Sequence, residues 1–227
     1  MKTALVTGAA SGIGLAVSRL FEKSGFKVYA LDLHFKNKSF SKEIQFDLGN
    51  LADIPKLIDS LGEIDVLVNN AGVQNAVSID RYTDEQRARI LRINLEAPVA
   101  LIQALSKQLV KRRSGRIVSL ASVAAYTAHT DLWYGVTKAG VVSFTRSFAA
   151  TLGPQGIQVN SVAPGPIDTP LLDRAQPERI EQLMKQVYTR RKGRPEEVAE
   201  AIRWLAVDAP ETINGAVIDI TDGCMLR

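Results

Sequence analysis

The chain has 227 residues, a mass of 24.7 kDa and a formal net charge of +4, from 28 Lys and Arg against 24 Asp and Glu. Hydrophobic residues make up 46% and charged residues 23%, which excludes a disordered or low-complexity chain. The single cysteine, Cys224, excludes a disulfide framework and a cysteine-rich zinc site, and no metal site is expected.

Short apolar runs alternate with longer amphipathic stretches from end to end. In chain order, we expect a strand at 4–6, a helix at 13–23, strands at 28–31 and 44–46, a helix at 51–61, a strand at 66–68, a helix at 83–110, a strand at 117–120, a helix at 133–152, a strand at 157–160, a helix at 195–207 and a strand at 217–220. Pro98 predicts a kink in the longest of these helices.

Strands buried on both faces that alternate with helices are typical of a parallel sheet covered on both sides. We therefore expect an α/β protein, a Rossmann-like doubly wound fold with a seven-stranded parallel sheet. Residues 33–42 are short for a parallel connection, and 36–39 do not look helical, so this crossover is expected to be a loop. No repeat or linker divides the chain, which predicts one domain over 1–227.

A glycine-rich turn follows the first strand, with Gly8, Gly12 and Gly14 at a G-x3-G-x-G spacing. Such a turn lets the backbone approach a pyrophosphate, and the next helix supplies free N–H donors. A glycine loop alone is weak evidence, because a tight turn gives the same pattern. Its place between the first strand and the first helix favours dinucleotide binding, with Ser11 and Ile13 also in contact.

Asp32 ends the second expected strand, eighteen residues beyond Gly14. A carboxylate there accepts hydrogen bonds from the adenosine ribose hydroxyls and repels a 2′-phosphate. No Arg or Lys stands at Ser11 or directly after Asp32 to pair with such a phosphate. These residues predict NAD in preference to NADP.

Tyr134 and Lys138 lie four residues apart, on one face of an expected helix. An unperturbed tyrosine, with a pKa near 10, is a poor base at neutral pH. A lysine charge about 4 Å away supplies roughly the 4 kcal/mol needed to lower that pKa to about 7. Ser122 follows the fifth strand and can hold a substrate oxygen beside the tyrosine. Asn94, a polar residue inside the long helix, either binds a water or caps a kink near Pro98.

With these motifs in order, the chain resembles a short-chain dehydrogenase/reductase over almost its whole length. Two features depart from the family pattern: Asp222-Gly223-Cys224, where the family often has Asp-Gly-Gly, and the short connection between the second and third strands. The matching residues are Thr7 to Gly14, Asp47 and Leu48, Asn69 to Gly72 (with Asn70 and Ala71), Asn94, Ser122, Tyr134, Lys138, Pro164, Gly165, Ile167 and Thr169.

The resemblance implies a catalytic tetrad. Tyr134 would be the general acid/base, and Lys138 would lower its pKa and bind the nicotinamide ribose. Ser122 would orient the substrate oxygen, and Asn94 would hold a water in a proton relay. The resemblance also implies that Asp47, Leu48, Asn70 to Gly72, Pro164, Gly165, Ile167 and Thr169 contact the cofactor, and that the protein is a homotetramer or homodimer.

The residues predict an NAD-dependent oxidoreductase acting on a small secondary alcohol or its ketone. One rival is a 3-oxoacyl-carrier-protein reductase, with basic clusters at 111–116 and 190–194 as docking sites; another is a non-catalytic dinucleotide-binding regulator. His34 and His129 stay ambiguous, and 171–188 is expected to form a lid over the substrate. Charge without interleaved aromatics does not support a nucleic-acid partner. No apolar run reaches the roughly 20 residues of a membrane span, so a cytoplasmic protein is expected.

Overall fold

The computed structural model describes residues 1–36, 40, 42–75, 77–174 and 177–226. The described residues form one sheet of parallel strands in the order β3-β2-β1-β4-β5-β6-β7, which confirms the predicted fold class. The strands are β1 (Thr3–Thr7), β2 (Lys27–Asp32), β3 (Glu43–Gln45), β4 (Val66–Asn69), β5 (Gly115–Leu120), β6 (Ile157–Pro164) and β7 (Val217–Ile220). The strand order reverses between β1 and β4, which is where doubly wound sheets hold their ligands.

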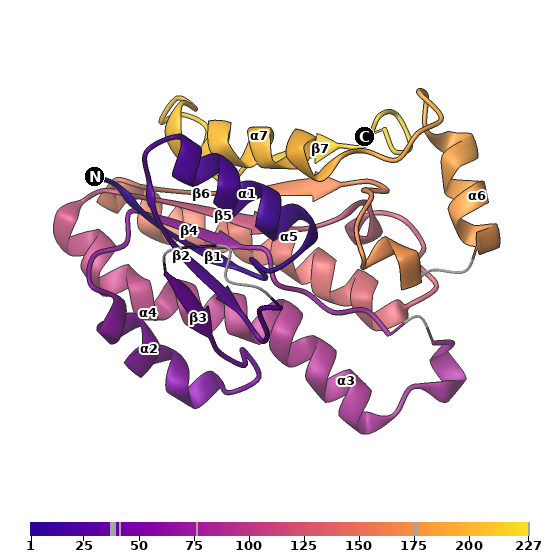
Figure 1. Cartoon of the computed structure of the whole chain (residues 1–227), viewed down its shortest axis with the longest axis horizontal. Coiled ribbons are helices and arrows are strands. Elements are labelled where there is room, and N and C mark those ends of the chain that lie inside the picture. Colours follow the sequence, from indigo (N-terminus) through magenta and orange to yellow (C-terminus); the bar gives the residue numbers. More distant parts are fainter. Residues whose placement is uncertain (37–39, 41, 76, 175–176, 227) are drawn as a thin grey trace.

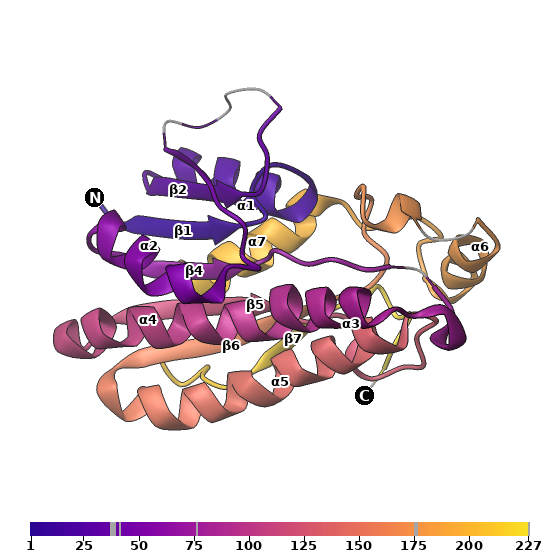
Figure 2. The ribbon, with the colours of Figure 1, turned by 90° about the horizontal axis from the view of Figure 1, so that it is seen from below.

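Helices cover both faces of the sheet (Figures 1 and 2). One face carries α1 (Gly12–Lys23) and α7 (Pro195–Val207), which pack against each other. The other carries α2 (Ile54–Leu61), α4 (Ala97–Arg112) and α5 (Leu132–Leu152). Two further helices, α3 (Asp84–Leu91) and α6 (Pro177–Gln186), extend beyond the sheet at one end of the molecule.

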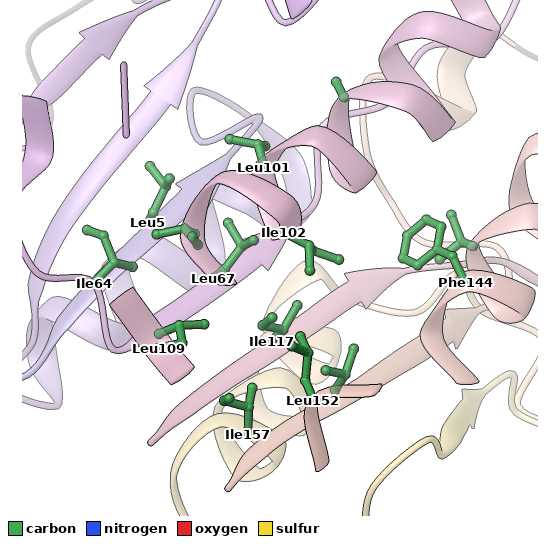
Figure 3. Close-up of a cluster of buried hydrophobic side chains, with 14 of the residues drawn as sticks. Leu5, Ile64, Leu67, Leu101, Ile102, Leu109, Ile117, Phe144, Leu152 and Ile157 are labelled. Carbon is green, nitrogen blue, oxygen red and sulfur yellow. The ribbon is translucent and has the colours of Figure 1, made fainter. Parts of the chain in front are cut away.

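The larger core lies between the sheet and helices α4 and α5. Figure 3 shows side chains from β1, β4, β5 and β6 meeting those of the two helices. Leu5, Leu101, Ile102 and Ile117 are fully buried there. Burying each such side chain contributes about 1.5–3 kcal/mol, which holds β1, β4, β5 and β6 against α4 and α5.

The long helix expected at 83–110 is interrupted. It consists of α3, a π-helical turn at Arg92–Glu96, and α4, with Pro98 in the first turn of α4. The expected kink at Pro98 is thus a change of helix type just before it, because proline offers no N–H to the carbonyl four residues earlier, that of Asn94. The N–H of Ala97 instead bonds the Arg92 carbonyl, five residues back. Such π-turns occur often at functional sites.

The connection from β2 to β3 is only partly visible. Residues 37–39 and 41, on which part of the predicted loop falls, lie outside the described residues. The described neighbours 33–36, 40 and 42 are not helical. Among the helices of the described chain, none is both long and apolar enough to cross a membrane.

Candidate active site

A cavity of about 620 Å³ opens at the carboxyl ends of the strands. It extends from the ends of β1 and β2 past the loops that follow β4, β5 and β6. Two predicted site residues, Gly14 and Asn94, are absent from its lining. The others all line it: Gly8, Ser11, Gly12, Ile13, Asp32, Asp47, Leu48, Asn70, Ala71, Gly72, Ser122, Tyr134, Lys138, Pro164, Gly165, Ile167 and Thr169.

The glycine loop is packed against the loop after β4. Gly8 has a φ of 67°, and a Cβ on it would lie 2.8 Å from the amide nitrogen of Asn70. Gly14 is tighter still, because its Cβ would lie 2.0 Å from the carbonyl oxygen of Gly8. The Thr7 hydroxyl accepts the N–H groups of Asn70 and Ala71, both at 3.0 Å. Only glycine fits at residues 8 and 14. Gly14 packs against the Gly8 carbonyl, behind the loop, and does not line the cavity.

The loop and its helix suit a dinucleotide. The side chain of Ser11, the residue before α1, makes no capping hydrogen bond within the described chain. The first N–H groups of α1 are therefore left for a ligand, and they favour an anionic group such as a pyrophosphate. The cavity is continuous from Asp32 past this helix end to Tyr134, so an adenosine and a reactive ring can occupy its two ends.

Asp32 reaches across to the glycine loop. Its Oδ2 accepts the N–H of Ala10 at 2.8 Å, and its Oδ1 accepts the N–H of Leu33 at 2.7 Å. These bonds fix the carboxylate at the mouth of the cavity. Each carboxylate oxygen can accept a second hydrogen bond, so the group remains able to accept ribose hydroxyls.

Ser122, Tyr134 and Lys138 converge at the other end of the cavity. The Ser122 hydroxyl lies close enough to Tyr134 to lower its pKa, and the Lys138 Nζ lies 5.5 Å from the centre of the Tyr134 ring. The same Nζ donates to the carbonyl oxygen of Leu120 at 2.7 Å. Helix α5 supplies the tyrosine and the lysine from adjacent turns, and the end of β5 supplies the serine and the Leu120 carbonyl.

The expected lowering of the Tyr134 pKa is wrong for this arrangement. Burial raises the pKa of Tyr134 to about 12, the hydrogen bond from Ser122 lowers it in part, and the negative charge of Asp131 raises it. Burial also lowers the pKa of Lys138 to about 8. The spacing rule counts the attraction of a lysine charge but omits desolvation, which opposes the charged form of both groups. Tyr134 therefore holds its proton at neutral pH.

Asn94 braces the loop after β4 from the π-turn. Its Oδ1 accepts the N–H of Val73 at 2.8 Å, and its Nδ2 donates to the Val73 carbonyl at 2.9 Å and to Thr137 at 3.2 Å. The side chain is buried. Its amide bonds Val73 and Thr137 and does not cap a helix beside Pro98, one of the two expected roles. Asn94 instead joins three elements of the site: the π-turn, the Val73 loop and α5.

The sequence-based prediction missed several cavity residues. His34, His129, Leu171, Leu172 and Leu183, all left open from sequence, line the cavity, whereas Met184 and Val187 of the expected lid do not. Those missed outright lie next to motifs or on α3, where no spacing rule marks them: Leu31, Leu33, Phe46, Val73, Gln74, Asn75, Arg89, Ile93, Leu120, Ala121, Val123, Thr127, Pro166 and Pro170.

Asp131 is a second omission, for which a signal was available. It stands before α5, at a position where Asp commonly caps a helix, and its Oδ1 accepts the N–H of Tyr134 at 3.0 Å. The side chain is fully buried. This cap fixes the start of the helix that carries Tyr134.

Most side chains of the two basic clusters have partners within the described chain. Arg113 and Arg116 donate to backbone carbonyls, those of Pro154 and of Leu205 and Ala209. The ion pairs are Arg112 with Glu63 and Asp65, Arg191 and Arg194 with Glu197, and Lys192 with Asp168 and Asp173. This pairing weakens the idea that the clusters dock an acidic carrier.

Comparisons with known proteins agree with this geometry. Residues 8–225 match the family model described as enoyl-(acyl carrier protein) reductase. The 3-oxoacyl-[acyl-carrier-protein] reductase of Thermotoga maritima is 34% identical, over 99% of this chain and 98% of its own. A solved 4-hydroxyisoleucine dehydrogenase with NADH is similar at a TM-score of 0.92 and 28% identity, covering 99% of both chains. A structure from Beutenbergia cavernae, described as an NAD(P) dependent gluconate 5-dehydrogenase and solved with NADP, is similar at a TM-score of 0.89 and 28% identity. The match covers 98% of this chain and 96% of that one.

Proposed function

Because this chain belongs to the short-chain dehydrogenase/reductase family, a family of nicotinamide-dependent oxidoreductases, we propose that it interconverts a small secondary alcohol and its ketone with NAD(H). The observation that carries this proposal is that Ser122, Tyr134 and Lys138 line the same cavity as the glycine loop and Asp32. A bound nicotinamide dinucleotide supplies the acceptor or donor of the hydride.

The protein's own residues handle the proton and the orientation. In reduction, Tyr134 gives its hydroxyl proton to the carbonyl oxygen as hydride reaches the carbonyl carbon, and Ser122 holds that oxygen. In oxidation, the Tyr134 phenolate takes the proton of the substrate hydroxyl. Lys138 lies over the tyrosine ring and would hold the ribose next to the nicotinamide, while Asn94 keeps the Val73 loop against α5. The role of each residue in this scheme is part of the proposal.

The preference for NAD over NADP rests on Asp32. Its carboxylate is held at the cavity mouth by Ala10 and Leu33 and repels a 2′-phosphate through its charge. The relatives leave this choice open, because one solved neighbour holds NADH and another NADP.

We expect Asp32→Asn to lower the ratio of the Kd for NADP to the Kd for NAD by about tenfold or more, since 1.4 kcal/mol corresponds to a factor of ten. The asparagine removes the charge and keeps one acceptor oxygen for the Ala10 N–H, while the exposed Leu33 N–H loses its acceptor. Calorimetric titration with both dinucleotides measures the ratio, with the exposed Asp59→Asn as a matched control. Wild-type protein that binds NADP more tightly than NAD would overturn the assignment.

A 3-oxoacyl-carrier-protein reductase is the second candidate. The similarity to the Thermotoga maritima reductase favours it, whereas the ion pairs within the basic clusters weaken the charge argument for a carrier. Titration with an acyl carrier protein separates the two candidates. Tight binding that weakens with Lys111→Ala or Arg190→Ala would restore this candidate, and binding that ignores both changes removes the clusters as its docking site.

The organisation of the protein follows from the site. Residues from the end of β1 to beyond β6 line one cavity, which supports a single domain over residues 1–227. A homotetramer or homodimer in the cytoplasm is proposed by analogy with the family alone.

A further inference from the structure

Asp131 does more than cap the helix of Tyr134. Its Oδ2 accepts the N–H of Asn75 at 2.8 Å, and its Oδ1 accepts the hydroxyl of Tyr82 at 2.9 Å. The Tyr134 N–H is bound to the same Oδ1. One fully buried carboxylate therefore ties the loop that carries Asn75, and Tyr82 two residues before α3, to the start of the helix that carries Tyr134.

The donors and acceptors along this chain fix the orientation of the Asn75 amide. Burial, and to a smaller extent the Asp131 carboxylate, raises the pKa of Tyr82 to about 12, so Tyr82 has one proton to give at neutral pH. A carboxylate can only accept, so that proton goes to Asp131. The Tyr82 oxygen must then accept from Asn75, whose Nδ2 lies 2.6 Å away.

The carboxamide oxygen of Asn75 takes no part in this series of hydrogen bonds. The backbone N–H of Asn75 donates to Asp131, and its side-chain Nδ2 donates to Tyr82. Within the part of the chain that the structure describes, no hydrogen bond to the Asn75 Oδ1 is formed. Asn75 lines the substrate end of the cavity together with Ser122, Tyr134 and His129. An acceptor of fixed orientation in a binding cavity selects for a donor on its ligand.

We propose that Asp131, Tyr82 and Asn75 form a specificity device in which the Asn75 carboxamide oxygen accepts a second hydroxyl group of the substrate, near the carbon that is oxidised or reduced. This inference rests on the proposed function and narrows its substrate class to hydroxylated secondary alcohols and the matching hydroxyketones. Asn75 is then a binding residue, and Tyr82 and Asp131 are positioning residues that act through it. A substrate without the second hydroxyl leaves the acceptor unpaired, which is how a site built for a polar group rejects apolar analogues.

The test compares two matched pairs of alcohols, glycerol against isopropanol and cyclohexanediol against cyclohexanol, by initial rates with NAD. The readout is the ratio of kcat/KM for the hydroxylated member to that for its partner. We expect this ratio to exceed one in the wild type and to fall about tenfold in Asn75→Ala, because a net hydrogen bond is worth about a factor of ten.

Tyr82→Phe removes the hydroxyl that orients Asn75 and should lower the same ratio. In the double variant, the fall in this ratio should not exceed that in Asn75→Ala alone, because both changes interrupt the same series of hydrogen bonds. Tyr29→Phe is the matched control: it deletes a half-buried hydroxyl bonded to the Leu61 carbonyl, outside the cavity lining, and should leave the ratio unchanged.

The outcomes separate the inference from the function on which it rests. An equal fall in kcat/KM for both members of a pair leaves the ratio unchanged in Asn75→Ala. That result would overturn the inference and leave the proposed oxidoreductase function standing. Turnover of a 3-oxoacyl thioester with no turnover of either pair would overturn it as well. Absence of turnover with every substrate and both dinucleotides would instead count against the proposed function.

Discussion

Tyr134→Phe is expected to lower kcat by about 10²- to 10⁴-fold, the usual contribution of a positioned general acid/base. The variant keeps the ring, which lies 5.0 Å from that of His129, and loses only the hydroxyl that Ser122 contacts. Dinucleotide affinity should therefore stay within about twofold of the wild type, well under the tenfold that 1.4 kcal/mol represents. Initial rates and calorimetric titration on the same preparation measure the two effects.

The control for this variant is Tyr29→Phe, which removes a tyrosine hydroxyl elsewhere in the fold and should retain full turnover. Undiminished turnover in Tyr134→Phe would show that the proton travels by another group. A parallel loss of turnover and dinucleotide binding would show that the substitution had damaged the fold of the cavity instead.

The raised pKa of Tyr134 sets a direction for the pH dependence of the wild type. With a pKa of about 12, the tyrosine is protonated at neutral pH, which suits the donation of a proton to a ketone. Alcohol oxidation needs the phenolate, so its rate should rise with pH across the alkaline range. Ketone reduction needs the phenol and should not rise. A pH–rate profile that rises in both directions would contradict this assignment.

Gly14→Ala is expected to weaken dinucleotide binding by about tenfold to a hundredfold, because overpacking costs about 1–3 kcal/mol. The new Cβ would stand 2.0 Å from the Gly8 carbonyl oxygen and 2.5 Å from the Asn70 Nδ2. Neither atom is the free end of a flexible side chain, since Asn70 itself donates to Thr7 and Gly8. The loop must move away from the start of α1, where the pyrophosphate is expected. Calorimetric titration with NAD gives the change.

Gly62→Ala separates loss of the loop from loss of stability. Gly62 has a φ of 76°, and a Cβ added to it would meet nothing within 4 Å, so an alanine there is strained but touches no part of the cavity. It should lower the free energy of unfolding by about 1 kcal/mol and leave the Kd for NAD unchanged. Wild-type affinity in Gly14→Ala would mean that this loop does not carry the dinucleotide.

Much of the fold was predictable because parallel strands buried on both faces have a plain signature. Val66 to Val68 form an apolar run in β4, and β5 carries the apolar Ile117, Val118 and Leu120. Each strand is followed by the loop that carries its site residues. The π-turn around Asn94 was not predictable in the same way. A turn with five residues has no periodic pattern of its own, and only Pro98 marked that the helix changes there.

The candidate site likewise has residues that the sequence predicts and properties that it does not. Gly8, Gly14, Ser122, Tyr134 and Lys138 could be named because their chemistry depends on residue type and spacing. The direction of the Tyr134 pKa could not be predicted, since burial depends on packing that no spacing encodes. The contact between Asn75 and Asp131 joins residues 56 positions apart, and nothing in the local sequence of either indicates the other.

The most direct test of the central claim follows the absorbance of reduced nicotinamide in the wild-type protein. Secondary alcohols are offered with NAD and NADP, and their ketones, a 3-oxoacyl thioester included, with NADH and NADPH. We predict turnover of at least one alcohol–ketone pair in both directions, faster with NAD(H) than with NADP(H). Tight dinucleotide binding without turnover of any alcohol or ketone would contradict the account and indicate a non-catalytic dinucleotide-binding regulator.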